Sequence, residues 1–226
     1  MGGARAAVAI LDIDPERAET AAREIASGGG VASAHQADVT DKTSVECAVA
    51  AAASRHGGLD VLVDSAGIGI RRLAVELSLS DWDKVGTVNL TSVFLCSEEA
   101  ARVMLQKGGG AIVKLGSIMG FSAASTPNVS YQATKGGVIN MTRALAVERA
   151  PSGIRVNAVA PTWVRTNLTA ALLGQLGVVE RIAALMPLKW LATPDEIAWA
   201  ILYLVNPAAG MVAGHTLAVD GGFLAQ

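Results

Sequence analysis

A tyrosine and a lysine that lie four residues apart, Tyr131 and Lys135, have the spacing in this sequence that most directly suggests chemistry. On a helix, residues at i and i+4 share one face, so the ammonium can lie close to the phenol. An unperturbed tyrosine, with a pKa of about 10, exchanges protons too reluctantly at neutral pH. A nearby positive charge favours the phenolate, as acid–base chemistry on a carbonyl/alcohol pair requires. The alternative interpretation is an ordinary surface pair on a helix.

Two further polar side chains could assist this pair. Ser117 ends the apolar stretch AIVKLGS, whose predicted strand places the hydroxyl beyond the carboxyl end of a sheet, where open α/β sheets bind ligands. There the hydroxyl could bind a substrate oxygen or serve only in a turn, and Ser122, Ser125 and Ser130 are competing serines. Asn89 falls inside a helical stretch, for which asparagine has poor propensity. An asparagine at this place indicates a functional residue, a kink in the helix, or a polar side chain whose hydrogen bonds are satisfied within the protein.

The elements that must position these side chains alternate regularly along the chain. Short apolar runs alternate with longer segments of helical period, which is typical of βαβ units and a parallel sheet. The strand predicted at 59–64 is nearly all apolar, so we expect it to be internal and covered on both faces. Other strands are predicted at 6–11 and 31–36 and in GAIVKLGS, IRVNAVAP and GHTLAVDGG, and helices at about 14–27, 41–55, 78–107 and 130–149 and from 193 onward.

Composition limits the class of protein. With 226 residues, 51% of them hydrophobic, the chain can bury one core, so we expect a single domain over 1–226. The formal charge is −2 and no basic cluster exceeds Arg71-Arg72, which argues against nucleic acid. Charges or glycines interrupt the apolar runs before the roughly 20 residues of a membrane span. Cys47 and Cys96 lack metal-ligand spacing, so we expect no metal and a reducing cytoplasmic location.

The segment YQATK, with NL and LGS upstream and IRVNAVAPTWVRT downstream, resembles the short-chain dehydrogenase/reductase family over essentially the whole chain. The ordered set of motifs makes the likeness specific, whereas the tyrosine and lysine alone recur by chance. The resemblance implies a Rossmann-like, doubly wound parallel sheet in three α/β/α layers. It also implies an NAD(P)-dependent oxidoreductase that transfers a hydride between the nicotinamide and a secondary alcohol or ketone. Homodimers or homotetramers through the helices near 91–107 and 131–149 are implied as well.

The same resemblance gives each candidate catalytic residue a role. Tyr131 is the acid/base and Ser117 polarises the carbonyl. Lys135 is the electrostatic activator, and Asn89 binds the water that links this lysine to solvent as a proton relay.

An aspartate, Asp12, ends the first predicted strand and is the candidate for recognising the cofactor. Asp14 is already occupied as the cap of the following helix. A carboxylate at the strand end accepts hydrogen bonds from an adenosine ribose diol and repels a 2′-phosphate, so NAD is favoured over NADP. A simple turn aspartate is the alternative.

Further cofactor contacts come from the resemblance. Asp38 and Val39 flank the adenine, Gly67 lets backbone approach the cofactor, and Thr166 touches the nicotinamide carboxamide. Tyr131 and Lys135 complete the set of implied cofactor-binding residues.

Four positions, Asp64, Ser65, Lys114 and Thr162, depart from the family pattern. Asp64 begins DSAG where the family usually has Asn-Asn-Ala-Gly, and an ionised carboxylate cannot donate as an amide does. Lys114 replaces a common asparagine on its strand, and Thr162 replaces the glycine usual after Pro161. If these changes weaken any property of the protein, we expect it to be the affinity for the cofactor.

The start of the sequence carries another departure. Family members begin with a strand and a glycine-rich turn, Thr-Gly-x-x-x-Gly-x-Gly, whereas the glycines at 28–30 here follow a predicted helix. We therefore expect the first strand and helix to be missing from this chain, which would remove an interior strand in the order 3-2-1-4-5-6. A truncated, non-catalytic scaffold that serves as an oligomer subunit is the alternative to an enzyme.

A largely apolar segment at about 163–190 lies where the family keeps a substrate lid. An apolar lid favours a small-molecule ketone or alcohol with a hydrophobic body, although any lid buries its inner face. Sugars and polyols, 3-oxoacyl thioesters, steroids and cyclic ketones all stay open as substrates.

Overall fold

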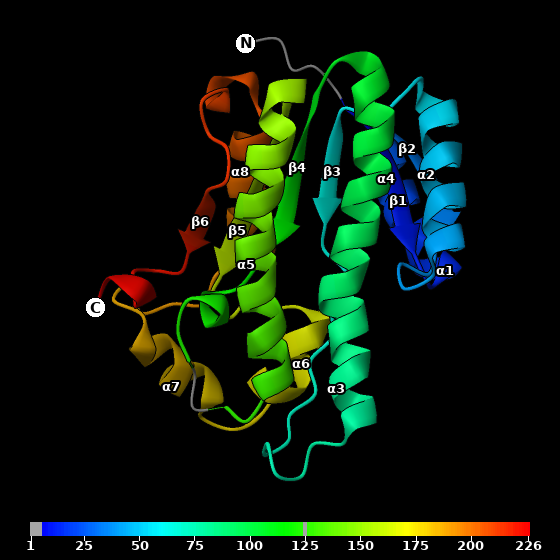
Figure 1. Cartoon of the computed structure of the whole chain (residues 1–226). Coiled ribbons are helices and arrows are strands. Elements are labelled where there is room, and N and C mark those ends of the chain that lie inside the picture. Colours follow the sequence, from blue (N-terminus) through cyan, green and yellow to red (C-terminus); the bar gives the residue numbers. More distant parts are fainter. Residues whose placement is uncertain (1–5, 124–125) are drawn as a thin grey trace.

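A computed structural model describes residues 6–123 and 126–226 of the chain. Strands and helices alternate along it, as the sequence pattern predicts (Figure 1). The strands are β1 (Ala7–Asp12), β2 (Val31–Gln36), β3 (Val61–Asp64), β4 (Gly110–Leu115), β5 (Ile154–Pro161) and β6 (Thr216–Val219). The helices are α1 (Pro15–Ser27), α2 (Lys42–His56), α3 (Leu79–Gly86), α4 (Ser92–Lys107), α5 (Val129–Arg149), α6 (Asn167–Leu173), α7 (Val178–Leu185) and α8 (Pro194–Val205).

All the strand pairs are parallel, and they form two hydrogen-bonded sheets. One sheet holds β1 and β2, and the other has the order β3-β4-β5-β6. Helices α4 and α5 cover the near face of the four-stranded sheet, and α8 lies behind it (Figure 1). The strands run the same way, so their carboxyl ends meet at one edge of the molecule. This arrangement is the expected three-layer, Rossmann-like α/β fold.

Two expectations about the sheet need correction. We expected the first strand and helix of the family, with their glycine-rich turn, to be missing, but the structure shows no missing unit: the described chain opens with a strand–helix unit, β1 and α1, at the positions where the sequence predicts a strand and a helix. We also expected the third strand to be internal and fully covered. In the structure β3 pairs only with β4, and Val61 and Val63 are 37% and 40% exposed. An edge strand has a neighbour on one side only, so its apolar side chains are left partly uncovered.

The core lies where the sheet is covered on both faces. Strands β4 and β5 are buried almost throughout. Met104 of α4 and Leu145 of α5 pack on Ile112 and Val156 on one side of the sheet, while α8 packs against the other. This packing fixes the carboxyl ends of β4 and β5, which carry site residues.

Caps set several helix boundaries where the sequence predicts them. Asp14 accepts hydrogen bonds from the amides of Glu16 and Arg17 at the start of α1. Ser78 caps α3, and Thr193 forms a reciprocal capping box with Glu196 before α8. The long predicted helix at 78–107 differs in one respect, because a π-helical turn at Thr87–Thr91 separates α3 from α4. Such turns frequently occur at functional sites.

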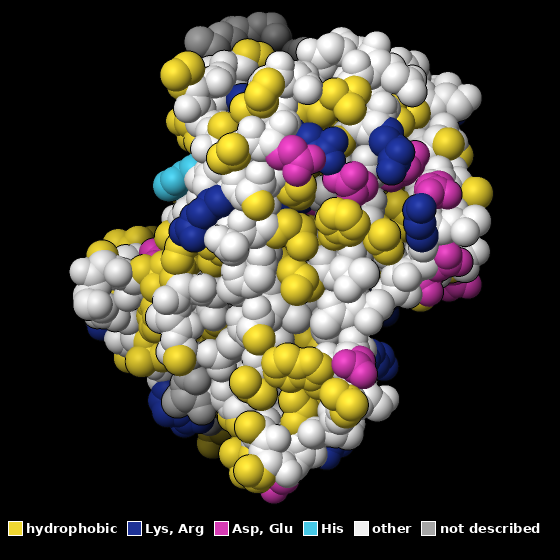
Figure 2. Space-filling view, viewed as in Figure 1, with side chains coloured by type: hydrophobic (Ala, Val, Ile, Leu, Met, Phe, Trp, Pro, Cys, Tyr) yellow, Lys and Arg dark blue, Asp and Glu magenta, His cyan; other side chains and the backbone are white. Residues whose placement is uncertain are grey.

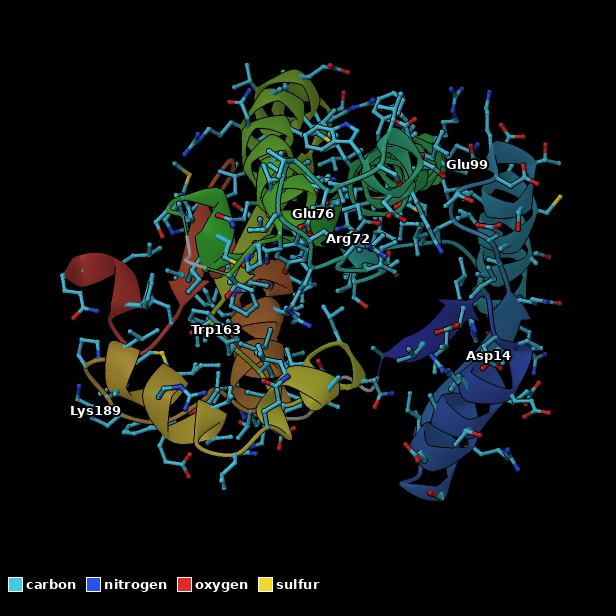
Figure 3. The ribbon with its side chains drawn as sticks, turned by 90° about the horizontal axis from the view of Figure 1, so that it is seen from below. Asp14, Arg72, Glu76, Glu99, Trp163 and Lys189 are labelled. Carbon is cyan, nitrogen blue, oxygen red and sulfur yellow. The ribbon has the colours of Figure 1, made fainter. Side chains whose placement is uncertain are left out.

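The predicted lid region folds into α6 and α7, which lie below the sheet in Figure 1. Seen from below in Figure 3, Trp163 lies between these helices and the centre of the molecule, while Lys189 lies at the outer end of the lid. Trp163, Val178, Ile182 and Met186 form a separate apolar cluster there. Within the described residues no single helix is long and apolar enough to cross a membrane; only α6 and α7 together reach that length, with a bend of 110°.

Candidate active site

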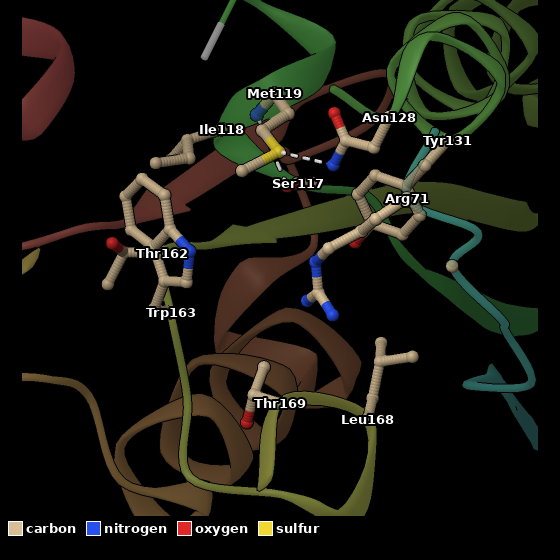
Figure 4. A pocket seen from close by; sticks show the side chains of 11 residues that line it. Arg71, Ser117, Ile118, Met119, Asn128, Tyr131, Thr162, Trp163, Leu168 and Thr169 are labelled. Atoms are coloured by element: carbon tan, nitrogen blue, oxygen red, sulfur yellow. Dashed lines mark hydrogen bonds between the residues drawn. The ribbon is translucent and has the colours of Figure 1, made fainter. Parts of the chain in front are cut away.

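A pocket opens at the carboxyl ends of β4 and β5, between the start of α5 and the segment that begins α6 (Figure 4). Its volume is about 510 Å³, which includes space open to solvent. The walls combine apolar side chains with a few hydroxyls, an amide and one guanidinium. They are Gly69, Arg71, Ser117, Ile118, Met119, Asn128, Tyr131, Thr162, Trp163, Leu168 and Thr169.

Tyr131 lies in the first turns of α5 and presents its ring to this pocket. Its hydroxyl and the Ser117 hydroxyl line the same pocket. Burial raises the pKa of the Tyr131 phenol above its usual value, while the nearby Ser117 hydroxyl and the charge of Arg71 act in the opposite direction. The phenol therefore holds its proton at neutral pH and can donate it.

Lys135 lies one turn further along α5, as the i,i+4 spacing predicts. Its Nζ is 5.6 Å from the centre of the Tyr131 ring and donates to the backbone oxygen of Leu115 at 2.6 Å. Burial lowers the pKa of Lys135 to about 8, and the negative charge of Asp64 opposes that shift. The interpretation as an ordinary surface pair is wrong, because Lys135 is only 4% exposed.

Ser117 follows β4 and caps a short 3₁₀ turn, in which its Oγ accepts a hydrogen bond from the Met119 amide at 3.2 Å. This buried hydroxyl lines the pocket beside Tyr131. The competing Ser122 and Ser130 do not line it, and Ser125 lies outside the described residues. Ser117 is therefore the serine of this set that the fold brings to the tyrosine.

Asn89 lies in the π-helical turn and is fully buried. Its side-chain oxygen accepts from the Ile68 amide, and its amide group donates to the Ile68 oxygen, both at 2.8 Å. The same amide group lies 3.3 Å from the Thr134 hydroxyl on α5. Asn89 thus ties the loop after β3 to the helix that carries Tyr131 and Lys135.

Asp64 and Lys114, two of the departures from the family pattern, face each other across β3 and β4. The Lys114 ammonium lies 3.5 Å from the Asp64 carboxylate, and Ser97 of α4 hydrogen-bonds to both groups. Burial raises the pKa of Asp64 and lowers that of Lys114, while their mutual attraction opposes both shifts. The two replacements therefore form one buried ion pair.

The candidate cofactor residues Asp12 and Asp38 lie at the carboxyl ends of β1 and β2, away from the pocket. Asp12 Oδ1 accepts from the Asp14 amide at 2.9 Å, and its other oxygen takes no hydrogen bond from the described residues. A ribose diol fits that free acceptor. Asp38 accepts from both the amide and the hydroxyl of Thr40, and these bonds lower its pKa.

The first turn of α1 has few free backbone N–H groups that could bind the phosphates of a dinucleotide. The Asp14 carboxylate already takes the amides of Glu16 and Arg17, so a phosphate there would meet negative charge in place of free donors. The other cofactor candidates lie apart from one another. Val39 packs against the core between α2 and α4, Gly67 lies next to Asn89 and Lys135, and Thr166 caps α6.

Sequence reasoning missed the pocket roles of Arg71, Asn128, Trp163 and Leu168. In the sequence, Arg71 is notable only as a member of the basic pair Arg71-Arg72. The signal that could have found it is its place four residues after Gly67, in the loop that leaves the carboxyl end of β3. Trp163 lies in the motif IRVNAVAPTWVRT and Leu168 in the predicted lid, but neither position is predicted from the sequence to have a role in the pocket.

Comparisons with known proteins agree with this geometry. A family model described as enoyl-(acyl carrier protein) reductase matches residues 2–224. The chain is 44% identical to cis-4-hydroxycyclohexanecarboxylate dehydrogenase of Sinomonas cyclohexanicum, over 97% of this chain and 87% of that protein. A short-chain type dehydrogenase/reductase from Mycobacterium marinum has a similar structure, with a TM-score of 0.93 and 31% identity over 97% and 86% of the two chains. A gluconate 5-dehydrogenase from Burkholderia cenocepacia, solved with NADP and tartrate, has a TM-score of 0.92 and 32% identity over 98% and 86%.

Proposed function

Because this chain belongs to the short-chain dehydrogenase/reductase family, we propose that it is an oxidoreductase that interconverts a secondary alcohol and a ketone with NAD(P). The observation that carries this proposal is the placement of Tyr131 and Ser117 together in the pocket wall, with the buried Lys135 ammonium behind the tyrosine ring. The relatives' names, which include dehydrogenases of a hydroxy acid and of gluconate, support the same reaction class.

Tyr131 and Ser117 have different roles at the substrate oxygen. A bound nicotinamide supplies the hydride acceptor or donor. Tyr131 keeps its proton at neutral pH, so in reduction the phenol donates that proton to the ketone oxygen. In oxidation the phenol must first lose its proton, along the path from Lys135 to solvent, and the resulting phenolate then takes the proton of the alcohol. Ser117 donates a hydrogen bond to the same oxygen and polarises the carbonyl.

Lys135 and Asn89 act behind the tyrosine. The Lys135 ammonium stabilises negative charge on the phenol oxygen, and among the described residues its three protons have one hydrogen-bond acceptor, the Leu115 oxygen. The remaining donors fit a ribose hydroxyl of the cofactor or a water. Asn89 fixes the Ile68 backbone, and a water held there would complete the path from Lys135 to solvent.

The carboxylate of Asp12 supports NAD as the preferred cofactor, since it offers an acceptor to the adenosine ribose and repels a 2′-phosphate. Asp38 and Val39 would flank the adenine. Gly67 would lie against the cofactor backbone, and Thr166 would contact the carboxamide. The solved gluconate 5-dehydrogenase holds NADP, so cofactor choice needs its own measurement.

The proposed enzyme is one domain over residues 1–226 with a lid at about 163–190, and it assembles as a homodimer or homotetramer. Helices α4 and α5 form the interface we propose. They lie side by side on the face shown in Figure 2, where apolar side chains reach the surface, and Phe94 and Val147 are 45% and 81% exposed. Size-exclusion chromatography with light scattering should show a dimer or tetramer that Val147→Glu weakens.

The activity test is oxidation of a panel of alcohols with NAD and with NADP, followed by cofactor absorbance. The panel contains 4-hydroxycyclohexanecarboxylate, gluconate, D-threitol, galactitol and cyclohexanol. We expect turnover of at least one alcohol, lost in both Tyr131→Phe and Ser117→Ala. Absence of turnover in every combination, from a folded protein, would favour the non-catalytic scaffold.

A further inference from the structure

Arg71 is the charged side chain among the residues that line the pocket. Among the described residues of the lining there is no aspartate or glutamate, and the others are apolar or carry a hydroxyl or an amide. In Figure 4 the guanidinium of Arg71 projects into the space between Tyr131 and Leu168. It is close enough for its charge to lower the pKa of the Tyr131 phenol. The pocket therefore carries a positive charge next to the reacting hydroxyls.

No ion pair or hydrogen bond within the described residues uses the Arg71 guanidinium. The neighbouring Arg72 differs, because its Nε lies 3.6 Å from the Asp81 carboxylate and its side chain does not line the pocket. Two adjacent arginines thus have different surroundings. One is paired on the surface, and the other presents five free donors to the pocket.

We infer that Arg71 binds the carboxylate of the substrate, and that the enzyme therefore acts on hydroxy acids and the corresponding oxo acids. This inference rests on the proposed function of the same site. A guanidinium presents its N–H groups as a planar fork that matches a carboxylate with two parallel hydrogen bonds. One arginine balances the single charge of a carboxylate, whereas a phosphate dianion would lack a second cation in this lining.

The rest of the pocket fits a compact apolar body between the two polar ends. Trp163, Ile118 and Leu168 supply apolar surface on the walls. The alcohol carbon would lie at Tyr131 and Ser117, with the carboxylate at Arg71. A ring or short chain that carries a hydroxyl and a separate carboxylate meets all three requirements.

The first test measures binding without catalysis. Cyclohexanecarboxylate has no hydroxyl to oxidise, so calorimetric titration with the cofactor-saturated enzyme reports recognition alone. We expect it to bind at least about tenfold more tightly than the neutral cyclohexanecarboxamide, because hydrogen bonds between two charged groups are stronger than those to a neutral amide. Arg71→Gln should remove this preference, Arg71→Lys should keep part of it, and Arg72→Gln is the matched control that should keep all of it.

The second test compares kcat/KM for 4-hydroxycyclohexanecarboxylate and its carboxamide. The ratio of the two values should fall at least about tenfold in Arg71→Gln and stay unchanged in Arg72→Gln. Turnover of both compounds without discrimination by Arg71 would overturn the inference and leave the proposed function intact. Weaker NADH binding by Arg71→Gln, with no change toward the carboxylate, would also overturn it. Carboxylate binding that depends on Arg71, without turnover of any alcohol, would instead reject the proposed function.

Discussion

At the scale of single residues, the site places side by side two ionisable groups whose pKa values burial shifts in opposite directions. Burial raises the pKa of Tyr131 and lowers that of Lys135, so both groups are pushed toward their neutral forms. The raised pKa of Tyr131 keeps the phenol protonated at neutral pH, which differs from the expectation that the nearby lysine favours its phenolate. Lys135, with a pKa of about 8, is the group of the two that titrates close to neutral pH, where acid–base groups are most effective.

Replacing the proposed acid should separate chemistry from folding. Tyr131→Phe removes only the hydroxyl, so we expect kcat to fall by at least about 100-fold with little change in the thermal unfolding temperature. Steady-state kinetics and a melting curve measure the two effects. A kcat within a few-fold of the parent would contradict the role assigned to Tyr131.

The buried ammonium of Lys135 should appear as a pH dependence of stability. Its folded pKa of about 8 lies below the ordinary 10.5, so folding releases a proton between these pH values and the folded state gains stability as pH rises through that window. Relative to Lys135→Met, the parent should gain about 1–3 kcal/mol in free energy of unfolding between pH 7 and pH 10. Urea melts of both proteins measure the difference. A constant difference would contradict the lowered pKa.

We predict that Asp12 determines the preference for NAD over NADP. Asp12→Ala removes an acceptor for the ribose diol and also removes repulsion of a 2′-phosphate, so KM should rise more for NAD than for NADP. Steady-state kinetics with both cofactors test this, with Asp14→Asn as the neighbouring control that keeps a side-chain oxygen for the helix cap. A parent enzyme that already prefers NADP would show that the role of Asp12 is wrong.

At the scale of elements, the site depends on how β3, β4 and α5 are held together. Asn89 connects the loop after β3 to α5, and Lys135 donates to the carbonyl oxygen at the end of β4. The Asp64–Lys114 pair joins the same two strands one residue before that carbonyl. A disturbance of the pair should therefore reach Lys135.

The Asp64–Lys114 pair should show strong coupling in a double-mutant cycle. Asp64→Asn or Lys114→Asn alone leaves one buried charge without its partner, which typically costs about 3–5 kcal/mol. The double variant places two amides face to face, as in the usual family pattern, and should recover at least about 2 kcal/mol of that loss. Denaturant melts measure each corner of the cycle. Additive effects would mean that the two residues are not a functional pair.

At the scale of the whole molecule, the strands belong to two separate sheets, so some strands lie inside a sheet and others at an edge. Strands β4 and β5 have neighbours on both sides, whereas β1 and β3 are each paired on one side only. The exposed valines of β3 lie on such an edge. Local stability should follow this difference.

Hydrogen exchange measured by mass spectrometry can test that expectation. Peptides that cover 61–64 should exchange faster than peptides that cover 154–161, because unpaired edge amides and thinner packing allow local opening. Peptides from α8 serve as an internal reference for global unfolding. Equal protection of β3 and β5 would show that another contact covers the β3 edge.

The sequence by itself determined the alternation of strands and helices, several caps and the family. These features depend on periodicity, on residues close in sequence such as Asp14 and Thr193, and on the four-residue spacing of Tyr131 and Lys135. The tertiary structure decided which distant residues meet. It pairs Asp64 with Lys114, selects Ser117 over its competitors at the tyrosine, and brings Arg71 into the pocket. It also leaves β3 at an edge, contrary to its apolar sequence. Strand order and loop paths follow from packing between segments far apart in the chain, which no local pattern contains.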